Sequence, residues 1–199
     1  MIKVNKNILI IGGTGFIGRN IVENLLCSTD NKLILIGRDH NKIDSFFKNK
    51  PVIIVKAELS DINTIEKTLI KYDIDIVIHL VSNLIPSSSN KDFNRENSEV
   101  IVPTFHLLEL LSKRNVKIIF FSSGGTIYGN EPNTISEDNK LKPINYYGHS
   151  KQIIENQILF LNRTKELSYL ILRPSNVYGK YQKINSNQGF IAVAIGKFL

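Results

Sequence analysis

The chain has 199 residues, 42% hydrophobic and 22% charged, which suits one α/β domain with a sizeable core. Its formal net charge is +7, but the basic residues form no run or recognised motif, so we expect no nucleic-acid partner. One cysteine excludes an internal disulfide and a cysteine-cluster metal site, and the four histidines lack ligand spacing. No apolar run approaches the roughly 18 residues of a membrane span. We therefore expect no bound metal, no membrane insertion and a cytoplasmic location.

Short apolar runs alternate with helical patterns along the whole chain. Strands are predicted over residues 7–11, 32–36, 51–55, 75–80, 116–122 and 168–173. Helices are predicted over 16–28, 40–48, 62–72, 98–113, 147–165 and 188–198, and polar loops over 82–94 and 130–145. Pro103 either kinks the fourth helix or marks its first turn. The alternation predicts an α/β fold, a Rossmann-type doubly wound parallel sheet with helices on both faces.

Glycines at positions 12, 13, 15 and 18 separate the first predicted strand from the first predicted helix. Gly12 suits a tight turn, Gly15 lets the backbone approach a pyrophosphate, and Gly18 lets helix and strand pack closely. The free N–H groups and the dipole of the helix start would face that anion. A tight loop without a ligand is the alternative, but the strand–turn–helix setting favours a dinucleotide site.

The end of the second strand bears on which dinucleotide is bound. NAD-binding folds usually place an acidic residue there for the ribose hydroxyls. This chain has Gly37 followed by Arg38, and a guanidinium suits a 2′-phosphate, so the sequence slightly favours NADP over NAD. Asp39 could still reach the ribose, and Arg38 could instead cap the surface or stack on adenine.

A second motif, Tyr147-x-x-x-Lys151, places both side chains on one helical face. With the other motifs it resembles the extended short-chain dehydrogenase/reductases, the NAD-dependent epimerase/dehydratase family that acts on nucleotide sugars. The matching pieces follow the family's order: the glycine turn, Asp75–Val81, Ser122–Gly129, Tyr147-x-x-x-Lys151 and Leu172–Gly179. This collinear set is more specific than any one motif, and it covers nearly the whole chain.

The resemblance implies an NAD(P)-binding Rossmann domain over residues 1–199. It implies these cofactor-binding residues: Gly12, Gly15, Phe16, Ile17, Gly18, Arg38, Glu58, Leu59, Leu80, Val81, Ser82, Ser122, Tyr147, Lys151, Pro174 and Val177. Asn176 would face a nucleotide-sugar substrate, although the 173–176 segment could simply be a strand end and turn.

The resemblance also implies transient hydride transfer between a sugar carbon and the nicotinamide. Epimerisation at C4, as in UDP-glucose 4-epimerase, is the expected outcome. Tyr147 would be the acid/base, and Lys151 would lower its pKa and hold the nicotinamide ribose. A free tyrosine has a pKa of about 10, so reaching neutrality requires roughly 3 units, or about 4 kcal/mol. The resemblance disfavours dehydration, because dehydratases of the family tend to carry an acidic pair beside the catalytic threonine and this chain has none beside Thr126.

Two positions depart from the family pattern. Gly124 stands where the family usually has its catalytic serine or threonine, so Ser123 or Thr126 would supply the hydroxyl. We favour Thr126, because Ser123 should alternate to the other side of the strand end. Asn97 is the nearest candidate for the family's helical asparagine, but its spacing to Thr104 differs.

Family members usually continue beyond the length of this chain, with residues that build a smaller lobe around the sugar. A truncated, non-catalytic NAD(P)-binding protein is therefore the alternative to an enzyme, and a scaffold without a cofactor is a third possibility. The apolar surface of the 147–165 helix, together with the resemblance, is also compatible with a homodimer.

Overall fold

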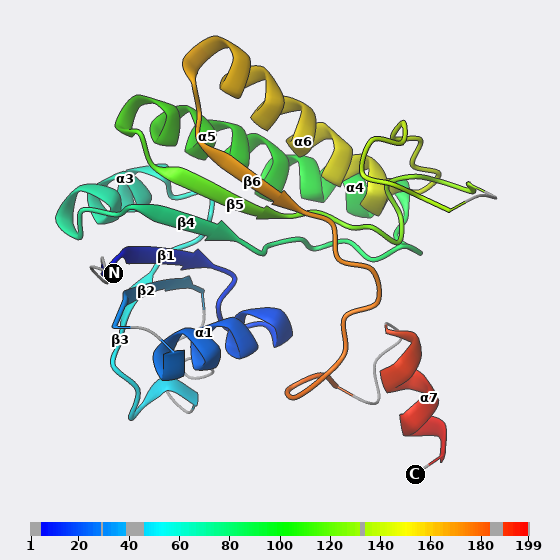
Figure 1. Ribbon diagram of the computed structural model, residues 1–199, viewed down its shortest axis with the longest axis horizontal. Helices are drawn as coiled ribbons and strands as arrows, with labels where there is room; N and C mark the ends of the chain where they lie inside the picture. Colours follow the sequence, from blue (N-terminus) through cyan, green and yellow to red (C-terminus); the bar gives the residue numbers. More distant parts are fainter. Residues whose placement is uncertain (1–4, 29, 39–45, 132–133, 184–188, 199) are drawn as a thin grey trace.

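The computed structural model describes residues 5–28, 30–38, 46–131, 134–183 and 189–198. Six strands form one parallel sheet in the order β3-β2-β1-β4-β5-β6 (Figure 1). They are β1 (Asn7–Ile11), β2 (Lys32–Gly37), β3 (Val52–Lys56), β4 (Ile76–His79), β5 (Lys117–Phe121) and β6 (Tyr169–Leu172). All six predicted strands are confirmed within two residues. The chain reverses its direction of travel across the sheet between β1 and β4, and ligands bind at such a switch point in open α/β sheets.

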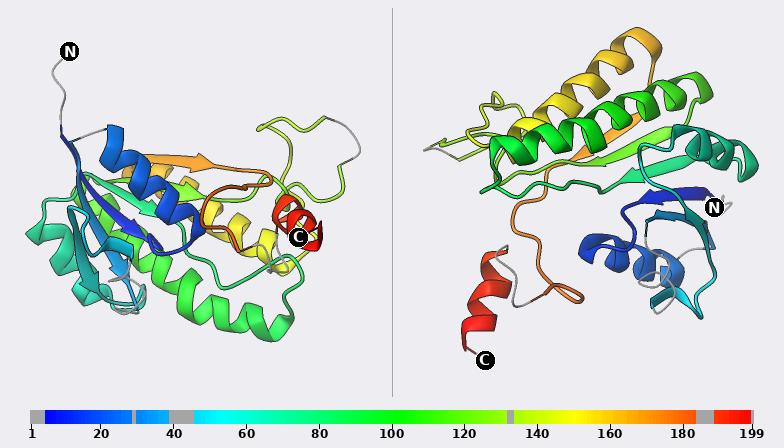
Figure 2. Two further views of the ribbon diagram at one scale, coloured as in Figure 1. Left: turned by 90° about the horizontal axis from the view of Figure 1, so that it is seen from below. Right: turned by 180° about the vertical axis from the view of Figure 1, so that it is seen from behind.

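Helices cover both faces of the sheet. They are α1 (Phe16–Ser28), α3 (Ile62–Lys71), α4 (Asn90–Glu96), α5 (Val102–Arg114), α6 (Tyr146–Lys165) and α7 (Phe190–Phe198). Figure 2 shows α1 on one face, α3, α5 and α6 on the other, and α7 apart from the sheet. The doubly wound fold is thereby confirmed. Most of the predicted 40–48 helix lies outside the described residues, although Phe46 and Phe47 are helical.

Strand side chains alternate between two hydrophobic cores. Leu9 and Ile11 of β1 face the core beneath α3, α5 and α6, where Phe120 and Leu107 are fully buried. Ile8 and Ile10 face the smaller core beneath α1, which Val22 completes. This alternation explains why the strands appear in the sequence as continuous apolar runs: both faces of the sheet are covered.

The region before β5 differs from the prediction. Residues 90–94 were expected in a loop, and this is wrong, because Ser89 and Asp92 form a capping box that starts α4. Helical structure then runs unbroken through a π-helical segment, η1 (Asn97–Ile101), into α5. Pro103 lies in the first turn of α5, which is one of the two predicted alternatives. The 130–145 segment contains no helix or strand among its described residues.

Candidate functional site

The glycine turn has the backbone that its sequence predicts. Gly12 has φ of +88°, and a Cβ there would lie 3.2 Å from both Leu80 Cβ and Val81 Cγ2. A Cβ on Gly18 would lie 2.5 Å from Gly12 O and from Gly13 Cα, so the start of α1 touches the turn directly. Side chains are therefore excluded at both positions, and the backbone at the start of α1 is brought close to the carboxyl ends of β1 and β4.

A polar pocket of about 210 Å³ opens beside this turn. Five of the predicted cofactor residues line this pocket, so the structure brings them together: Gly12, Arg38, Glu58, Leu59 and Val81. They come from the carboxyl ends of β1, β2, β3 and β4. Convergence of four strand ends on one pocket is the arrangement that Rossmann-type folds use for a dinucleotide.

The Tyr147–Lys151 pair lies at the start of α6, whose N-cap Asn145 accepts a hydrogen bond from Gly148 N–H at 2.8 Å. Lys151 is buried, with Nζ 5.6 Å from the centre of the Tyr147 ring and 5.1 Å from that of Phe120. Burial lowers the pKa of Lys151 to about 8, although Glu96 and Glu155 oppose the shift. Burial also raises the pKa of Tyr147, which the Ser123 hydroxyl partly offsets and the Glu96 charge increases. The phenol therefore keeps its proton at neutral pH.

The hydroxyls after β5 correct one expectation. Ser123 does not point away: its hydroxyl is close enough to Tyr147 to lower the pKa of the phenol, and Thr126 donates a hydrogen bond to Ser123 Oγ at 2.9 Å. The alternation argument for Thr126 was wrong because β5 ends at Phe121 and the next residues form a turn. A Cβ on Gly124 would lie 2.5 Å from Arg173 O, so there is no room for a serine there.

Among the described residues, two buried side-chain atoms have no hydrogen-bond partner, the Nδ1 of His79 and the Oγ of Ser122. His79 Nε2 lies 3.0 Å from Thr104 Oγ1, and burial, with the charge of Lys151, lowers the pKa of His79 to about 3. A buried polar atom without a partner is costly, and a ligand can satisfy it. Both residues lie at carboxyl ends of central strands, Ser122 among the predicted cofactor residues.

Of the neighbouring residues Glu96 and Asn97, it is Glu96 that turns inward. The Asn97 side chain is exposed, whereas Glu96 is buried and accepts hydrogen bonds from the Ser82 hydroxyl at 2.9 Å and from Asn83 N–H at 2.8 Å. The Val102 N–H donates to Asn97 O, the i to i+5 bond of a π-helix, which accommodates an extra residue. This π-helical segment lies between Asn97 and Thr104, where the spacing departs from the family pattern.

Glu155 is a second site residue that the sequence analysis missed. It is buried and forms a two-pronged ion pair with Arg173, whose Nε and Nη2 donate at 3.1 and 2.8 Å. Arg173 also donates to the Tyr128 hydroxyl at 2.8 Å. A sequence signal for Glu155 existed, because steps of four residues place Tyr147, Lys151 and Glu155 on one face of α6. No comparable signal marks Glu96.

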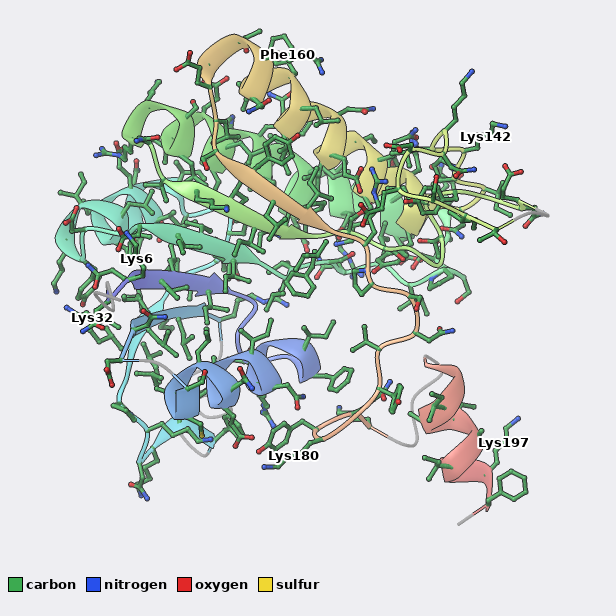
Figure 3. The ribbon with its side chains drawn as sticks, in the orientation of Figure 1. Lys6, Lys32, Lys142, Phe160, Lys180 and Lys197 are labelled. Atoms are coloured by element: carbon green, nitrogen blue, oxygen red, sulfur yellow. The ribbon has the colours of Figure 1, made fainter. Side chains whose placement is uncertain are left out.

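The remaining predicted residues lie on the segment after β6 and on α1. Phe16 and Ile17 line a separate groove of about 350 Å³ with Val177, away from the polar pocket. Pro174 O accepts from Gly124 N–H at 2.8 Å, which joins the segment to the end of β5. Asn176 is exposed. Figure 3 shows this segment, which carries the labelled Lys180, descending from the sheet toward α1.

Comparison with known proteins identifies the class to which this fold and site belong. A family model, the NAD dependent epimerase/dehydratase family, matches residues 8–199. The chain therefore belongs to this family.

Individual relatives and solved structures show which members of the family the chain is similar to. The chain is 34% identical over 195 residues to a putative UDP-glucose 4-epimerase of Methanocaldococcus jannaschii, covering 96% of this chain and 63% of the relative. It is 30% identical to dTDP-4-dehydro-6-deoxyglucose reductase of Escherichia coli, covering 96% and 62%. The structure of UDP-glucose 4-epimerase from Thermotoga maritima superposes with a TM-score of 0.82 at 28% identity, covering 94% and 61%. The chain thus spans about three fifths of the length of these proteins.

Among the described residues, no three histidine, cysteine, aspartate or glutamate side chains gather in a way that could hold a metal ion. None of the helices described combines the length and hydrophobicity that crossing a membrane requires.

Proposed function

We propose that residues 1–199 form the NAD(P)-binding domain of a nucleotide-sugar epimerase that inverts a sugar at C4. The supporting observation is that the glycine-turn pocket and the Tyr147–Lys151 pair, whose lysine is buried, flank the same carboxyl edge of the sheet. Relatives named as UDP-glucose 4-epimerases from Methanocaldococcus jannaschii and Thermotoga maritima add support.

The residues fit a dinucleotide. The Gly12–Gly18 turn would hold the pyrophosphate, Glu58 and Leu59 would lie beside adenine, and Lys151 would hold the nicotinamide ribose. The path between these groups would be lined by Leu80, Val81, Ser82 and Ser122. The part of the site around the nicotinamide would be completed by Phe16, Ile17, Pro174 and Val177. Once bound, the oxidised cofactor supplies a hydride acceptor and a positive charge.

Tyr147 would remove the proton from the sugar hydroxyl and later return it. Burial keeps the phenol protonated in the free protein although Lys151 lies beside it, so a further positive charge, such as that of the oxidised cofactor, is required before it can act as a base. Ser123 is the hydroxyl best placed to assist, since it lowers the pKa of Tyr147 and is itself oriented by Thr126. Asn176 would contact the sugar.

Cofactor preference is the second element of the proposal. Arg38 lines the pocket at the end of β2 and favours NADP through a 2′-phosphate. The UDP-glucose 4-epimerase of Thermus thermophilus was solved in complex with NAD, which favours the other cofactor. We propose that Arg38 decides the preference, so Arg38→Asp should shift it toward NAD. A cytoplasmic location and a homodimer formed through α5 and α6 remain predictions that fit this function.

The direct test is conversion of UDP-glucose to its C4 epimer by the purified protein with NAD or NADP. Tyr147→Phe should reduce turnover by about 10²- to 10⁴-fold while cofactor binding is retained. Ser123→Ala should reduce it more than Thr126→Val, because the Ser123 hydroxyl acts on the phenol and Thr126 orients that hydroxyl. Cofactor binding without turnover of any nucleotide sugar would instead support a non-catalytic NAD(P)-binding protein.

A further inference from the structure

Arg19, in the first turn of α1, carries a guanidinium that neither the motifs nor the proposed proton transfer uses. Its Nε donates to Thr14 O at 3.0 Å, and its guanidinium carbon lies 4.7 Å from the centre of the Phe46 ring. A guanidinium that stacks on an aromatic ring keeps its in-plane N–H donors for a ligand. These two contacts hold the side chain in place, and both Nη groups have no hydrogen-bond partner within the described part of the chain.

The charge of Arg19 is also unpaired, whereas its basic neighbours have a partner. Lys50 lies over the same Phe46 ring, 4.1 Å from its centre, and pairs with Glu23 at 2.7 Å. Lys180 pairs with Glu23 as well, at 3.1 Å. Arg19 forms no ion pair with any residue that the structure describes, so its charge is the one in this group that an anionic ligand could match.

Both contacts of Arg19 place it on the adenosine side of the proposed dinucleotide site. Thr14, whose carbonyl binds the Arg19 Nε, lines the polar pocket together with Arg38 at the end of β2. Phe46 belongs to the segment that follows β2. The residues proposed for the nicotinamide side line the separate groove instead. Arg19 is therefore tied to the wall of the pocket in which adenine would lie.

The charges of this pocket show what a second cation contributes. The lining carries one guanidinium, that of Arg38, against the two carboxylates of Glu58 and Glu99. A phosphate monoester carries about 1.5 to 2 negative charges at neutral pH, so the lining by itself would not attract one. Arg19 adds the second guanidinium, and two guanidinium groups match the charge of such a phosphate.

We propose that Arg19 acts with Arg38 to bind the 2′-phosphate of NADP. The preference between the two cofactors then depends on Arg19 as well as on Arg38. This inference rests on the proposed function only in that the adenosine half of a dinucleotide binds in the polar pocket. It involves neither the sugar substrate nor the proton-transfer residues.

The test is calorimetric titration of the purified chain with adenosine 2′,5′-bisphosphate and with AMP, which differ only in the 2′-phosphate. The parent should bind the bisphosphate more tightly than AMP. Arg19→Gln should weaken bisphosphate binding by about 10- to 100-fold, as expected for lost hydrogen bonds to a charged group, and should leave AMP binding unchanged. Lys50→Gln is the matched control. It removes a charge from the same Phe46 ring, but one that Glu23 already neutralises, so it should change neither affinity.

Equal affinities of the parent for the two ligands would overturn the proposal, and so would an unchanged bisphosphate affinity in folded Arg19→Gln. A parallel loss of both ligands in Arg19→Gln, or an equal loss of the bisphosphate in Lys50→Gln, would also overturn it, because the effect would then not be specific to the 2′-phosphate. If Arg19→Gln does not fold, Arg19→Lys keeps the charge without the planar fork and should weaken bisphosphate binding by a smaller factor. No change in Arg19→Lys would then overturn the proposal.

This outcome is separable from that of the proposed function, because no turnover is measured. Loss of the bisphosphate preference in Arg19→Gln would support the role of Arg19 even if the chain converted no nucleotide sugar. Equal binding of the bisphosphate and AMP by the parent would remove that role and leave an NAD-dependent epimerase standing. A folded parent that binds neither ligand would overturn both the role of Arg19 and the proposed adenosine site.

Discussion

The two sides of the candidate site are built differently. The Tyr147 side rests on buried contacts: Lys151 and Glu155 are buried on α6, and Glu96 is buried on α4. The segment after β6, which would face the nicotinamide and the sugar, is largely exposed, and Tyr178 retains 65% of its surface. Proton-transfer groups must be held accurately, and the fold supplies that through the core.

The exposed segment is secured mainly at its two ends. Arg173 binds Glu155 at the start, and Lys180 and Tyr181 bind Glu23 of α1 at the end, at 3.1 and 2.6 Å. Residues 174–179 between these anchors carry the predicted Pro174, Asn176 and Val177. The placement of this segment therefore depends on two ion-pair clusters, one at Glu155 and one at Glu23.

Loss of the buried anchor should have the largest effect. Glu155→Gln leaves the Arg173 guanidinium without its buried carboxylate, and breaking such a pair costs about 3–5 kcal/mol of unfolding free energy. Denaturant unfolding monitored by circular dichroism measures it. Glu109→Gln is the control, since its ion pair with Lys165 is exposed and should contribute little. Equal effects of the two substitutions would refute the distinction between the anchors and ordinary surface pairs.

Adding a side chain at the glycine turn should have the second-largest effect on stability. Gly18→Ala places a methyl group against Gly12 O and Gly13 Cα, and overpacking of this kind costs about 1–3 kcal/mol. Cofactor affinity should fall with it, because the turn must move. Gly125→Ala is the matched control, since nothing lies within 4 Å of a Cβ there. Calorimetric titration of both variants compares them, and an unchanged affinity in Gly18→Ala would contradict the role of the turn.

Acidification should weaken the two sides of the candidate site in different pH ranges. Burial lowers the pKa of His79 from 6.5 to about 3, and hydrogen bonds from Lys50, Tyr181 and Lys180 lower the pKa of Glu23 from 4.5 to about 2. The unfolded chain therefore binds more protons, first below about pH 6.5 and then below about pH 4.5, and stability falls in both windows. His79→Gln should reduce the first fall and Glu23→Gln the second, to which Asp61, Asp75 and Asp92 also contribute because their pKa values are lowered too. A stability profile that neither variant changes would contradict both assignments.

A substitution at the C-terminal end of α6 should have the smallest effect on stability. Glu166, its C-cap, has φ of +56°, a left-handed conformation that glycine adopts without strain. Glu166→Gly should therefore raise the unfolding free energy by up to about 1 kcal/mol. Arg163→Gly, inside the helix, should lower it by about the same amount. Thermal unfolding of both variants measures the difference, and a destabilised Glu166→Gly would be inconsistent with strain at this cap.

The sequence predicted what depends on local pattern. The strand ends, the Gly12 and Gly18 conformations and the shared face of Tyr147 and Lys151 follow from hydrophobic runs, backbone sterics and helical spacing. What it missed depends on packing: Glu96 turns inward because a π-helical segment follows it, and Ser123 reaches Tyr147 because β5 ends two residues earlier. Neither event has a signature in residue type or spacing. The start of α4 was missed although Ser89 and Asp92 carry a capping signal.

Calorimetric titration of the purified chain with NAD⁺ and NADP⁺ would show whether the Gly12–Gly18 turn and the strand ends beside it bind a dinucleotide. We expect saturable binding that is tighter for NADP⁺ because of Arg38, and that is weakened in Gly18→Ala but not in Gly125→Ala. A folded chain that binds neither cofactor would show that this edge of the sheet is not a dinucleotide site.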